Sequence, residues 1–175
     1  MTHADEILLT SNQIQSRILE LAREIERDYP EGGPIHLVTV LKGGFMFLAD
    51  LVRYMTPGRV TLDFMALSSY GKGLTTSGEV RVLKDLDYRL EGRDVIVVED
   101  IVDTGLTLRY LHGILGARSP RSLRTACLLS KPSRRIVDVK VDYIGFTIED
   151  RFVVGYGLDF AEQYRNLPHI AILHQ

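Results

Sequence analysis

Carboxylates and small polar residues gather in the middle of the chain, directly after a short apolar run. This run, residues 95–98, predicts a buried strand, and the amphipathic stretch 106–115 predicts a helix. Between and around the two lie the residues that could do chemistry: Glu99, Asp100, Asp103, Thr104, Gly105 and Thr107. The spacing therefore predicts a strand–loop–helix corner that carries three carboxylates.

A corner of this composition is suited to bind a phosphate group. Successive backbone N–H groups point out of the turn, and the helix dipole favours an anion at its N-terminus. Small hydroxyl side chains add donors without blocking the approach. The carboxylates would repel a bare phosphate, so they indicate a cation, or sugar hydroxyls attached to that phosphate. We therefore expect a pocket for a phosphorylated sugar, with Mg²⁺ nearby.

Residues 99–107, Glu-Asp-Ile-Val-Asp-Thr-Gly-Leu-Thr, resemble the ribose-phosphate loop of the type I phosphoribosyltransferases. The resemblance implies that Glu99 and Asp100 address the ribose hydroxyls and the metal ion, and that Asp103 is the catalytic base. It assigns the sugar 5-phosphate to Thr104, Gly105, Leu106 and Thr107. For any single residue, an acidic strand end before an ordinary turn is the better explanation, and only the whole set of residues favours the phosphate site. A receiver-type signalling domain also favours acidic pairs at strand ends, but it makes no use of Asp-Thr-Gly-x-Thr.

A second strand-to-helix corner precedes this one, at Leu41-Lys42-Gly43-Gly44. Its two glycines allow the backbone to approach an anion closely, and Lys42 adds positive charge. A glycine pair after a strand is also an ordinary turn. In the resembling family such a segment binds pyrophosphate, which implies that role for Lys42 and Gly43, and the peptide bond after the leucine can be cis.

Residues 68–78 form a polar, glycine-rich stretch that is longer than compact domains usually tolerate without a function. A plain surface excursion is one interpretation. The other is a lid, because a transition state with oxocarbenium character must be shielded from water. Ser69 and Tyr70 match the Ser-Tyr pair in the mobile loop of the purine-salvage members, where the pair closes over pyrophosphate.

Lys131 follows the predicted strand 123–129, so it is expected at the same rim of the sheet. A solvated basic turn, Lys-Pro-Ser-Arg-Arg, is the simpler interpretation. In the functional one, the ammonium donates to a carbonyl oxygen of a base. That would favour a 6-oxopurine over adenine, because the 6-amino group of adenine and the Lys131 ammonium are both hydrogen-bond donors.

The C-terminal segment 152–159, Phe-Val-Val-Gly-Tyr-Gly-Leu-Asp, resembles the purine-binding segment of hypoxanthine-guanine phosphoribosyltransferases. An aromatic ring such as that of Phe152 can stack on a purine, and a nearby carbonyl, at Val153, can accept from an exocyclic amine. Asp159 could bind a second Mg²⁺. Arg165 matches the C-terminal arginine that contacts pyrophosphate in the family.

Composition limits the classes of protein that this chain can form. It has 175 residues, 45% of them hydrophobic and 25% charged, which suits one compact domain. The net charge of −2 provides no electrostatic basis for nucleic acid as the main partner. The single cysteine, Cys127, lies in an apolar stretch and predicts a core residue in a reducing compartment. Neither a membrane-spanning run nor a signal-peptide pattern is evident, so we expect a cytoplasmic protein.

Helices and strands alternate along the chain. Ser11–Asp28 is the clearest helix, with a capping-box pattern at Thr10 and Gln13, and Ile35–Leu41 is a continuous apolar strand. A helix is expected at residues 45–55, and further strands at 60–67, 80–83, 123–129, 143–146, 152–154 and 170–173. This order predicts an α/β fold with a mostly parallel central sheet flanked by helices.

The resemblance implies the type I phosphoribosyltransferase fold, a single domain over residues 1–175. Its core would span about 35–130, with a small hood from about 1–10 and 131–175 and a mobile loop at about 68–80. The implied reaction transfers 5-phosphoribosyl from 5-phospho-α-D-ribose 1-diphosphate to hypoxanthine or guanine, with Mg²⁺ as cofactor, in purine salvage. A relative that prefers xanthine, or a regulator of the same fold that senses nucleotides and binds RNA, is the alternative. The family also implies a homodimer or homotetramer.

Overall fold

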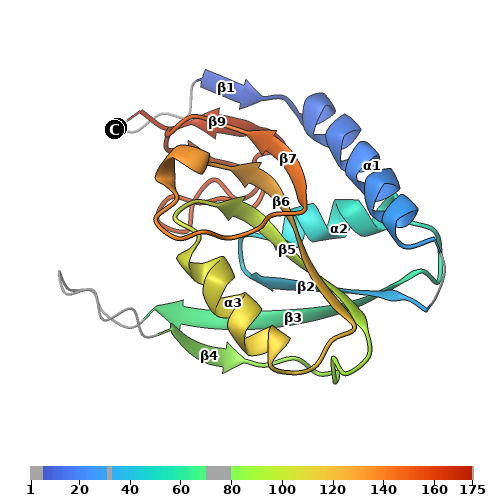
Figure 1. Cartoon of the computed structure of the whole chain (residues 1–175). Helices are drawn as coiled ribbons and strands as arrows, with labels where there is room; N and C mark the ends of the chain where they lie inside the picture. The colour runs from blue at the N-terminus through green and yellow to red at the C-terminus, as the bar shows by residue number, and fades with distance from the viewer. Residues whose placement is uncertain (1–5, 31–32, 70–79, 175) are drawn as a thin grey trace.

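A six-stranded sheet forms the centre of the molecule (Figure 1). The computed structural model describes residues 6–30, 33–69 and 80–174, and the strands follow the order β4-β3-β2-β5-β6-β7 across the sheet. Their bounds are β2 Ile35–Leu41, β3 Val60–Ser69, β4 Val80–Lys84, β5 Asp94–Val102, β6 Ser122–Ser130 and β7 Tyr143–Thr147. Only β4 runs antiparallel to its neighbour, which confirms the predicted mostly parallel α/β sheet.

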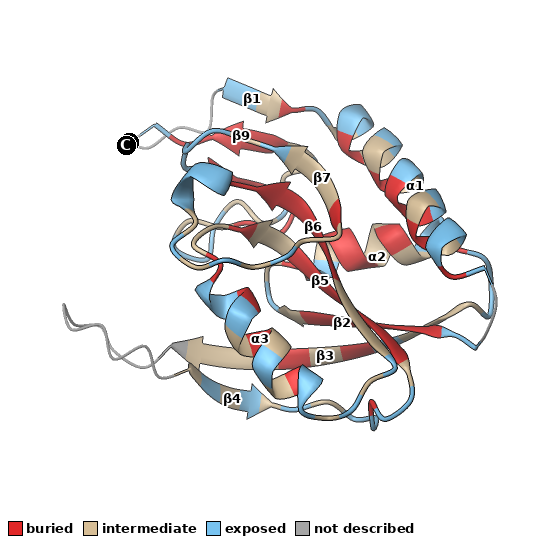
Figure 2. Ribbon diagram, in the orientation of Figure 1, coloured by how far each residue is buried: buried red, intermediate tan, exposed pale blue. Residues whose placement is uncertain are grey.

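Helices cover both faces of this sheet. The helices α1 (Ser11–Asp28) and α2 (Phe45–Arg53) pack on one face, and α3 (Leu106–Gly116) packs on the other (Figure 1). The central strand β5 therefore has no solvated side: Ile96 and Val98 face the first helix pair, whereas Val95 and Val97 face α3. Figure 2 shows the buried residues concentrated along β2, β5 and β6. Burial on both faces explains the uninterrupted apolar runs in the sequence.

The helix α1 begins with the capping box that the sequence predicts. The amide of Thr10 donates to Gln13 Oε1 at 2.9 Å, and the amide of Gln13 donates to Thr10 Oγ1 at 3.3 Å. The guanidinium of Arg17, on the same helix, donates to the carbonyls of Ile144 and Gly145 in β7. The helix is thus tied to the edge of the sheet by a charged side chain as well as by apolar packing.

A second, antiparallel sheet joins the two ends of the chain in the order β1-β9-β8. It consists of β1 (Glu6–Leu9), β8 (Val153–Val154) and β9 (Ile170–Ile172). The short 3-10 helix η1 (Pro132–Arg134) lies between β6 and β7 in the chain. The sequence analysis did not predict β1, since four residues with an irregular register gain their order from pairing with the distant β9. This sheet is the small hood that the resemblance implies.

Several element boundaries differ from the predictions by a few residues. The helix expected at 45–55 ends at Arg53, and β5 continues through Glu99 and Asp100 to Val102. In β3 the side chains of Asp63 and Met65 are buried, whereas Leu62 is exposed. Asp63 tolerates burial because its carboxylate accepts the backbone N–H groups of residues 64, 87 and 88.

Cys127 is a core residue, as predicted. Its side chain is fully buried on the α3 face of the sheet, and burial raises the pKa of the thiol to about 12. Across the described ranges, no helix is long and apolar enough to cross a membrane.

Candidate active site

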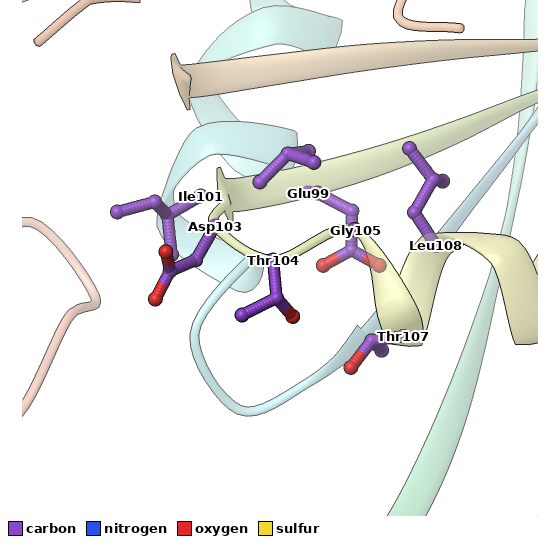
Figure 3. Close-up of a pocket in the computed structure, with 8 residues that line it drawn as sticks. Glu99, Ile101, Asp103, Thr104, Gly105, Thr107 and Leu108 are labelled. Atoms are coloured by element: carbon purple, nitrogen blue, oxygen red, sulfur yellow. The ribbon is translucent and has the colours of Figure 1, made fainter. Parts of the chain in front are cut away.

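The turn from β5 into α3 forms a pocket of about 310 Å³ (Figure 3). Gly105 caps α3 in a left-handed conformation with φ +87°, and a Cβ added there would lie 2.9 Å from Val139 Cγ2. Glycine is therefore required by both backbone and packing. The pocket is lined by Glu99, Ile101, Val102, Asp103, Thr104, Gly105, Thr107 and Leu108. The predicted phosphate turn and two of its carboxylates meet in one cavity.

Leu106 is the residue of the predicted phosphate set that does not line this pocket. It is the first residue of α3, and it is half exposed at 50%. Its backbone N–H lies 3.4 Å from Thr104 Oγ1.

Glu99 is a buried carboxylic acid at the inner wall of the pocket. The residue is only 8% exposed, and its Oε1 has no hydrogen-bond partner among the described residues. Burial, and secondarily the charge of Asp100, raises the pKa of Glu99 well above its ordinary value. A buried acceptor that faces a polar pocket fits sugar hydroxyls or a cation as its missing partner.

Asp100 projects away from this pocket, toward the Lys42-Gly43-Gly44 corner. A Cβ on Gly43 would lie 1.8 Å from Asp100 Oδ2, and one on Gly44 would lie 2.2 Å from Thr39 Oγ1. Both glycines are therefore needed to bring the corner against β5 and its neighbour β2. Burial raises the pKa of Asp100 to about 6, with a further small increase from Asp159 and an opposing effect of Arg165.

Charged side chains from the hood surround the same corner. Arg165 Nη2 lies 2.9 Å from Asp159 Oδ1 and 3.2 Å from Glu162 Oε1, and Lys42 Nζ pairs with Glu162 Oε2 at 2.6 Å. The peptide bond between Leu41 and Lys42 is cis, as the resemblance implied. The structure thus brings the predicted pyrophosphate residues Lys42, Gly43 and Arg165 together next to Asp100.

A second pocket of about 210 Å³ adjoins the first. The two share Ile101 and Asp103, so one ligand could extend across both. This second pocket is lined by Ile101, Asp103, Lys131, Phe152, Val153, Leu158 and Asp159. Every residue predicted to contact a purine therefore lines one cavity, together with the predicted catalytic base.

Lys131 is buried at the end of β6, which excludes the solvated basic turn as its description. It is 7% exposed, its Nζ donates to the Arg151 carbonyl at 2.5 Å, and Asp150 Oδ1 lies 3.7 Å away. A buried ammonium is retained where hydrogen bonds and a counter-charge compensate for lost hydration. These contacts hold the lysine at the wall of the second pocket.

Asp103 lies where the two pockets meet, and Figure 3 shows it beside Thr104 at the end of β5. Its Oδ1 accepts a hydrogen bond from Arg134 Nε at 3.2 Å, and both side chains remain partly exposed. The carboxylate is therefore oriented but still accessible to a ligand.

No group of three metal-ligating side chains comes together anywhere in the described ranges. Glu99 and Asp100 point to different sides of β5, and Asp159 belongs to the hood. The donor set nevertheless fits Mg²⁺, which is usually held by one or two carboxylates plus substrate oxygens and water. Of the predicted lid residues, Tyr70 lies outside the described residues, and Ser69 is described only as the last backbone position of β3.

Sequence reasoning missed the residues that hold these loops in place. Tyr156, in a left-handed conformation with φ +49°, donates to Asp50 Oδ2 in α2 and so ties the purine segment to the core. A Cβ on Gly157 would lie 2.2 Å from the Gly43 carbonyl, so the two segments touch directly. The Gly-Tyr-Gly pattern is a local signal for such a turn, but its docking partners are distant in sequence.

Comparison with known proteins places this geometry in a family. The model of the phosphoribosyl transferase domain matches residues 5–161. The hypoxanthine phosphoribosyltransferase of Salmonella typhimurium is 49% identical over 172 residues, covering 97% of this chain and 96% of the relative. The hypoxanthine-guanine phosphoribosyltransferase of Mycobacterium tuberculosis is 50% identical over 172 residues, covering 95% and 85%.

Solved structures agree with the sequence comparison. The crystal structure of a hypoxanthine-guanine phosphoribosyltransferase from Bacillus anthracis superimposes with a TM-score of 0.91 at 45% identity. It covers 99% of this chain and 100% of that one. The chain therefore belongs to the type I phosphoribosyltransferases, and within them to the hypoxanthine-guanine group.

The raised pKa of Asp100 predicts an unusual pH dependence of stability. Between the ordinary pKa of 3.8 and about 6, the folded state keeps a proton that the unfolded state has lost, so stability falls as pH rises through this window. Asp100→Asn should therefore raise the free energy of unfolding at pH 7.5, by about 1–3 kcal/mol. The gain should vanish below pH 4 in urea titrations.

Asp94 provides the matched control on the same strand. Its carboxylate is hydrogen-bonded by Arg121, which lowers its pKa, so its contribution is present at neutral pH and is lost as pH falls. Asp94→Asn should therefore destabilise the protein at pH 7.5. A destabilised Asp100→Asn at that pH would contradict the assignment of Asp100 as a poorly solvated charge.

Proposed function

We propose that this protein is a hypoxanthine-guanine phosphoribosyltransferase of purine salvage. It would transfer the 5-phosphoribosyl group of 5-phospho-α-D-ribose 1-diphosphate to N9 of the base and release pyrophosphate. The observation that carries this proposal is the pair of adjoining pockets, one built on a phosphate-binding turn and one on Lys131 and Phe152, which meet at Asp103.

The sugar donor would lie across the first pocket and the Lys42–Gly43 corner. Backbone N–H groups at Thr104 and Gly105, with the hydroxyl of Thr107, would bind the 5-phosphate at the N-terminus of α3. Glu99 would accept from a ribose hydroxyl, which supplies the partner that its buried oxygen lacks. These contacts would bring C1 of the ribose to the boundary between the two pockets.

The leaving pyrophosphate would be held on the other side of β5. Lys42 and Arg165 would provide positive charge there, with the main chain of Gly43, and Ser69 and Tyr70 would close over it. Mg²⁺, when bound through Glu99, Asp100 or Asp159 and the donor's oxygens, would neutralise charge on the leaving group. Glu162 forms ion pairs with Lys42 and Arg165. The pyrophosphate would compete with Glu162 for these two cations.

The base would occupy the second pocket. Lys131 would donate to the 6-oxo group, the ring of Phe152 would cover one face, and the Val153 carbonyl would accept from the 2-amino group of guanine. As N9 bonds to C1, the C1–oxygen bond to pyrophosphate breaks, and Asp103 accepts the proton from N7. The ion pair with Arg134 orients the Asp103 carboxylate for this task.

We also propose a division of function between the parts of the chain. The core of about 35–130 would bind the sugar donor, and the hood formed by about 1–10 and 131–175 would bind the base, with 68–80 as a mobile loop. The compartment would be the cytoplasm. We also propose a homodimer or homotetramer, for which the partly exposed Phe45 and Tyr54 at the two ends of α2 are candidate contacts.

The deciding experiment is base-dependent release of pyrophosphate from 5-phospho-α-D-ribose 1-diphosphate and Mg²⁺. Hypoxanthine, guanine, xanthine and adenine are tested in parallel, and we expect turnover with the first two and none with adenine. Turnover with xanthine alone would identify a relative with another preference. Tight donor binding without turnover on any base would overturn the enzymatic proposal, and a gel shift with RNA would then test the regulatory alternative.

Asp103→Asn tests the base. The variant should bind donor and hypoxanthine with little change, because the amide keeps the shape of the side chain. Its kcat should fall by about 10²–10⁴-fold, which is the usual contribution of a general base. Glu91→Gln, which changes an exposed carboxylate that lines neither pocket, is the control. An unchanged kcat in Asp103→Asn would remove this residue from the role.

Lys131→Met tests recognition of the 6-oxo group. Methionine keeps the apolar stem but removes the donor, so the ratio of kcat/KM for hypoxanthine to that for adenine should fall by at least about tenfold. Lys140→Met removes an exposed lysine that is paired with Asp142, and it should leave the ratio unchanged. If Lys131→Met preserves the preference over adenine, another group reads the 6-position.

A further inference from the structure

The guanidinium of Arg135 lies between the carboxyl ends of β5 and β6. Its Nη1 donates to the carbonyls of Val102 and Asp103 and lies 3.4 Å from the carbonyl of Lys131, and its Nη2 donates to Ser130 Oγ at 2.9 Å. One cation thus joins the last residue of β5, the proposed base and the segment that carries the purine lysine. The sequence analysis assigned Arg135 to a basic turn and gave it no role.

These hydrogen bonds determine the direction of the peptide groups that enter the phosphate turn. In a planar trans peptide the carbonyl and the following N–H point in opposite directions. Holding the carbonyls of Val102 and Asp103 toward Arg135 therefore turns the N–H groups of Asp103 and Thr104 away from it. Because Asp103 and Thr104 line the first pocket, this is the arrangement that an anion there requires.

The segment that follows Arg135 supports the next part of the turn. The Ile136 N–H donates to the Thr104 carbonyl at 3.1 Å. Around Gly105, the methyl groups of Val137 and Val139 and the Cδ of Arg135 occupy the space where a Cβ would stand. The turn thus lies on a platform formed by residues 135–139, and only a glycine can pack on it.

Two adjacent arginines hold Asp103 in different ways. Arg134 hydrogen-bonds the Asp103 side chain, whereas Arg135 hydrogen-bonds its backbone carbonyl. The Val102 carbonyl also accepts a hydrogen bond from the Lys131 N–H at 3.0 Å. Among the described hydrogen bonds, only Arg135 donates to the Asp103 carbonyl.

We propose that Arg135 is a positioning residue for this reaction: it orients the Asp103 and Thr104 peptides for the sugar phosphate. The inference rests on the proposed function and deepens it. Arg135 does not line either pocket, so it acts through the backbone rather than by touching substrate. Lysine cannot replace Arg135, because a single ammonium group lacks the planar fork with which the guanidinium reaches both carbonyls and Ser130.

Arg135→Ala and Arg135→Lys test the proposal in the full-length protein. We expect KM for 5-phospho-α-D-ribose 1-diphosphate to rise about tenfold or more in both variants, whereas KM for hypoxanthine changes less than about threefold. Added guanidinium chloride at millimolar concentration should partly restore Arg135→Ala, and equal sodium chloride should not. Arg118→Lys is the control, because Arg118 pairs with Asp85 beyond the far end of α3.

The results distinguish the proposed enzymatic activity from the positioning role of Arg135. An inactive wild-type protein defeats the proposed function. With an active wild type, unchanged donor KM in both variants, or an equal rise for both substrates without guanidinium rescue, overturns the role of Arg135. If both variants lose cooperative unfolding, the residue serves folding rather than positioning, and the proposal also fails. A selective donor effect together with rescue by guanidinium supports it.

Discussion

Two adjacent carboxylates on the central strand of the sheet set the conditions for the rest of the site. Glu99 and Asp100 stand on β5 after four residues that are buried on both faces, and burial raises the pKa of both acids. Water cannot solvate them fully, so the surrounding structure must supply polar partners. Alternation along the strand sends Glu99 into one cavity and Asp100 toward the glycine corner, which divides the charge between two sides of the site.

The loops around this strand end are held by polar contacts rather than by apolar packing alone. Arg135 fastens the end of β5 to that of β6, Tyr156 fastens the hood to α2, and Gly157 allows the hood to touch Gly43. Each contact joins a predicted ligand-binding segment to a rigid element. A site assembled from several loops keeps its geometry only with such support, because binding groups displaced by about 1 Å lose much of their effect.

Predictions from sequence succeeded where the signal is local. The strand–turn–helix corner at residues 99–107, the glycine corner at 41–44 and the capping box of α1 all depend on neighbours within a few residues, and the structure contains each of them. Resemblance to a family then supplied the order of the motifs along the chain. The predictions missed β1, which gains its order from pairing with the distant β9. They also did not include the burial of Asp63, which three backbone N–H donors make possible.

The α/β class, the motifs of the site and the residue types available for phosphate, base and metal can be predicted from the amino-acid pattern alone. Which of these residues meet depends on the tertiary structure. It placed Lys131 beside Phe152 and Asp103, separated Glu99 from Asp100, and gave Arg135 its partners. The physical reason is that periodicity and turn chemistry act over a few residues. Contacts between strand ends, in contrast, depend on the order of strands in the sheet and on the burial that this order produces.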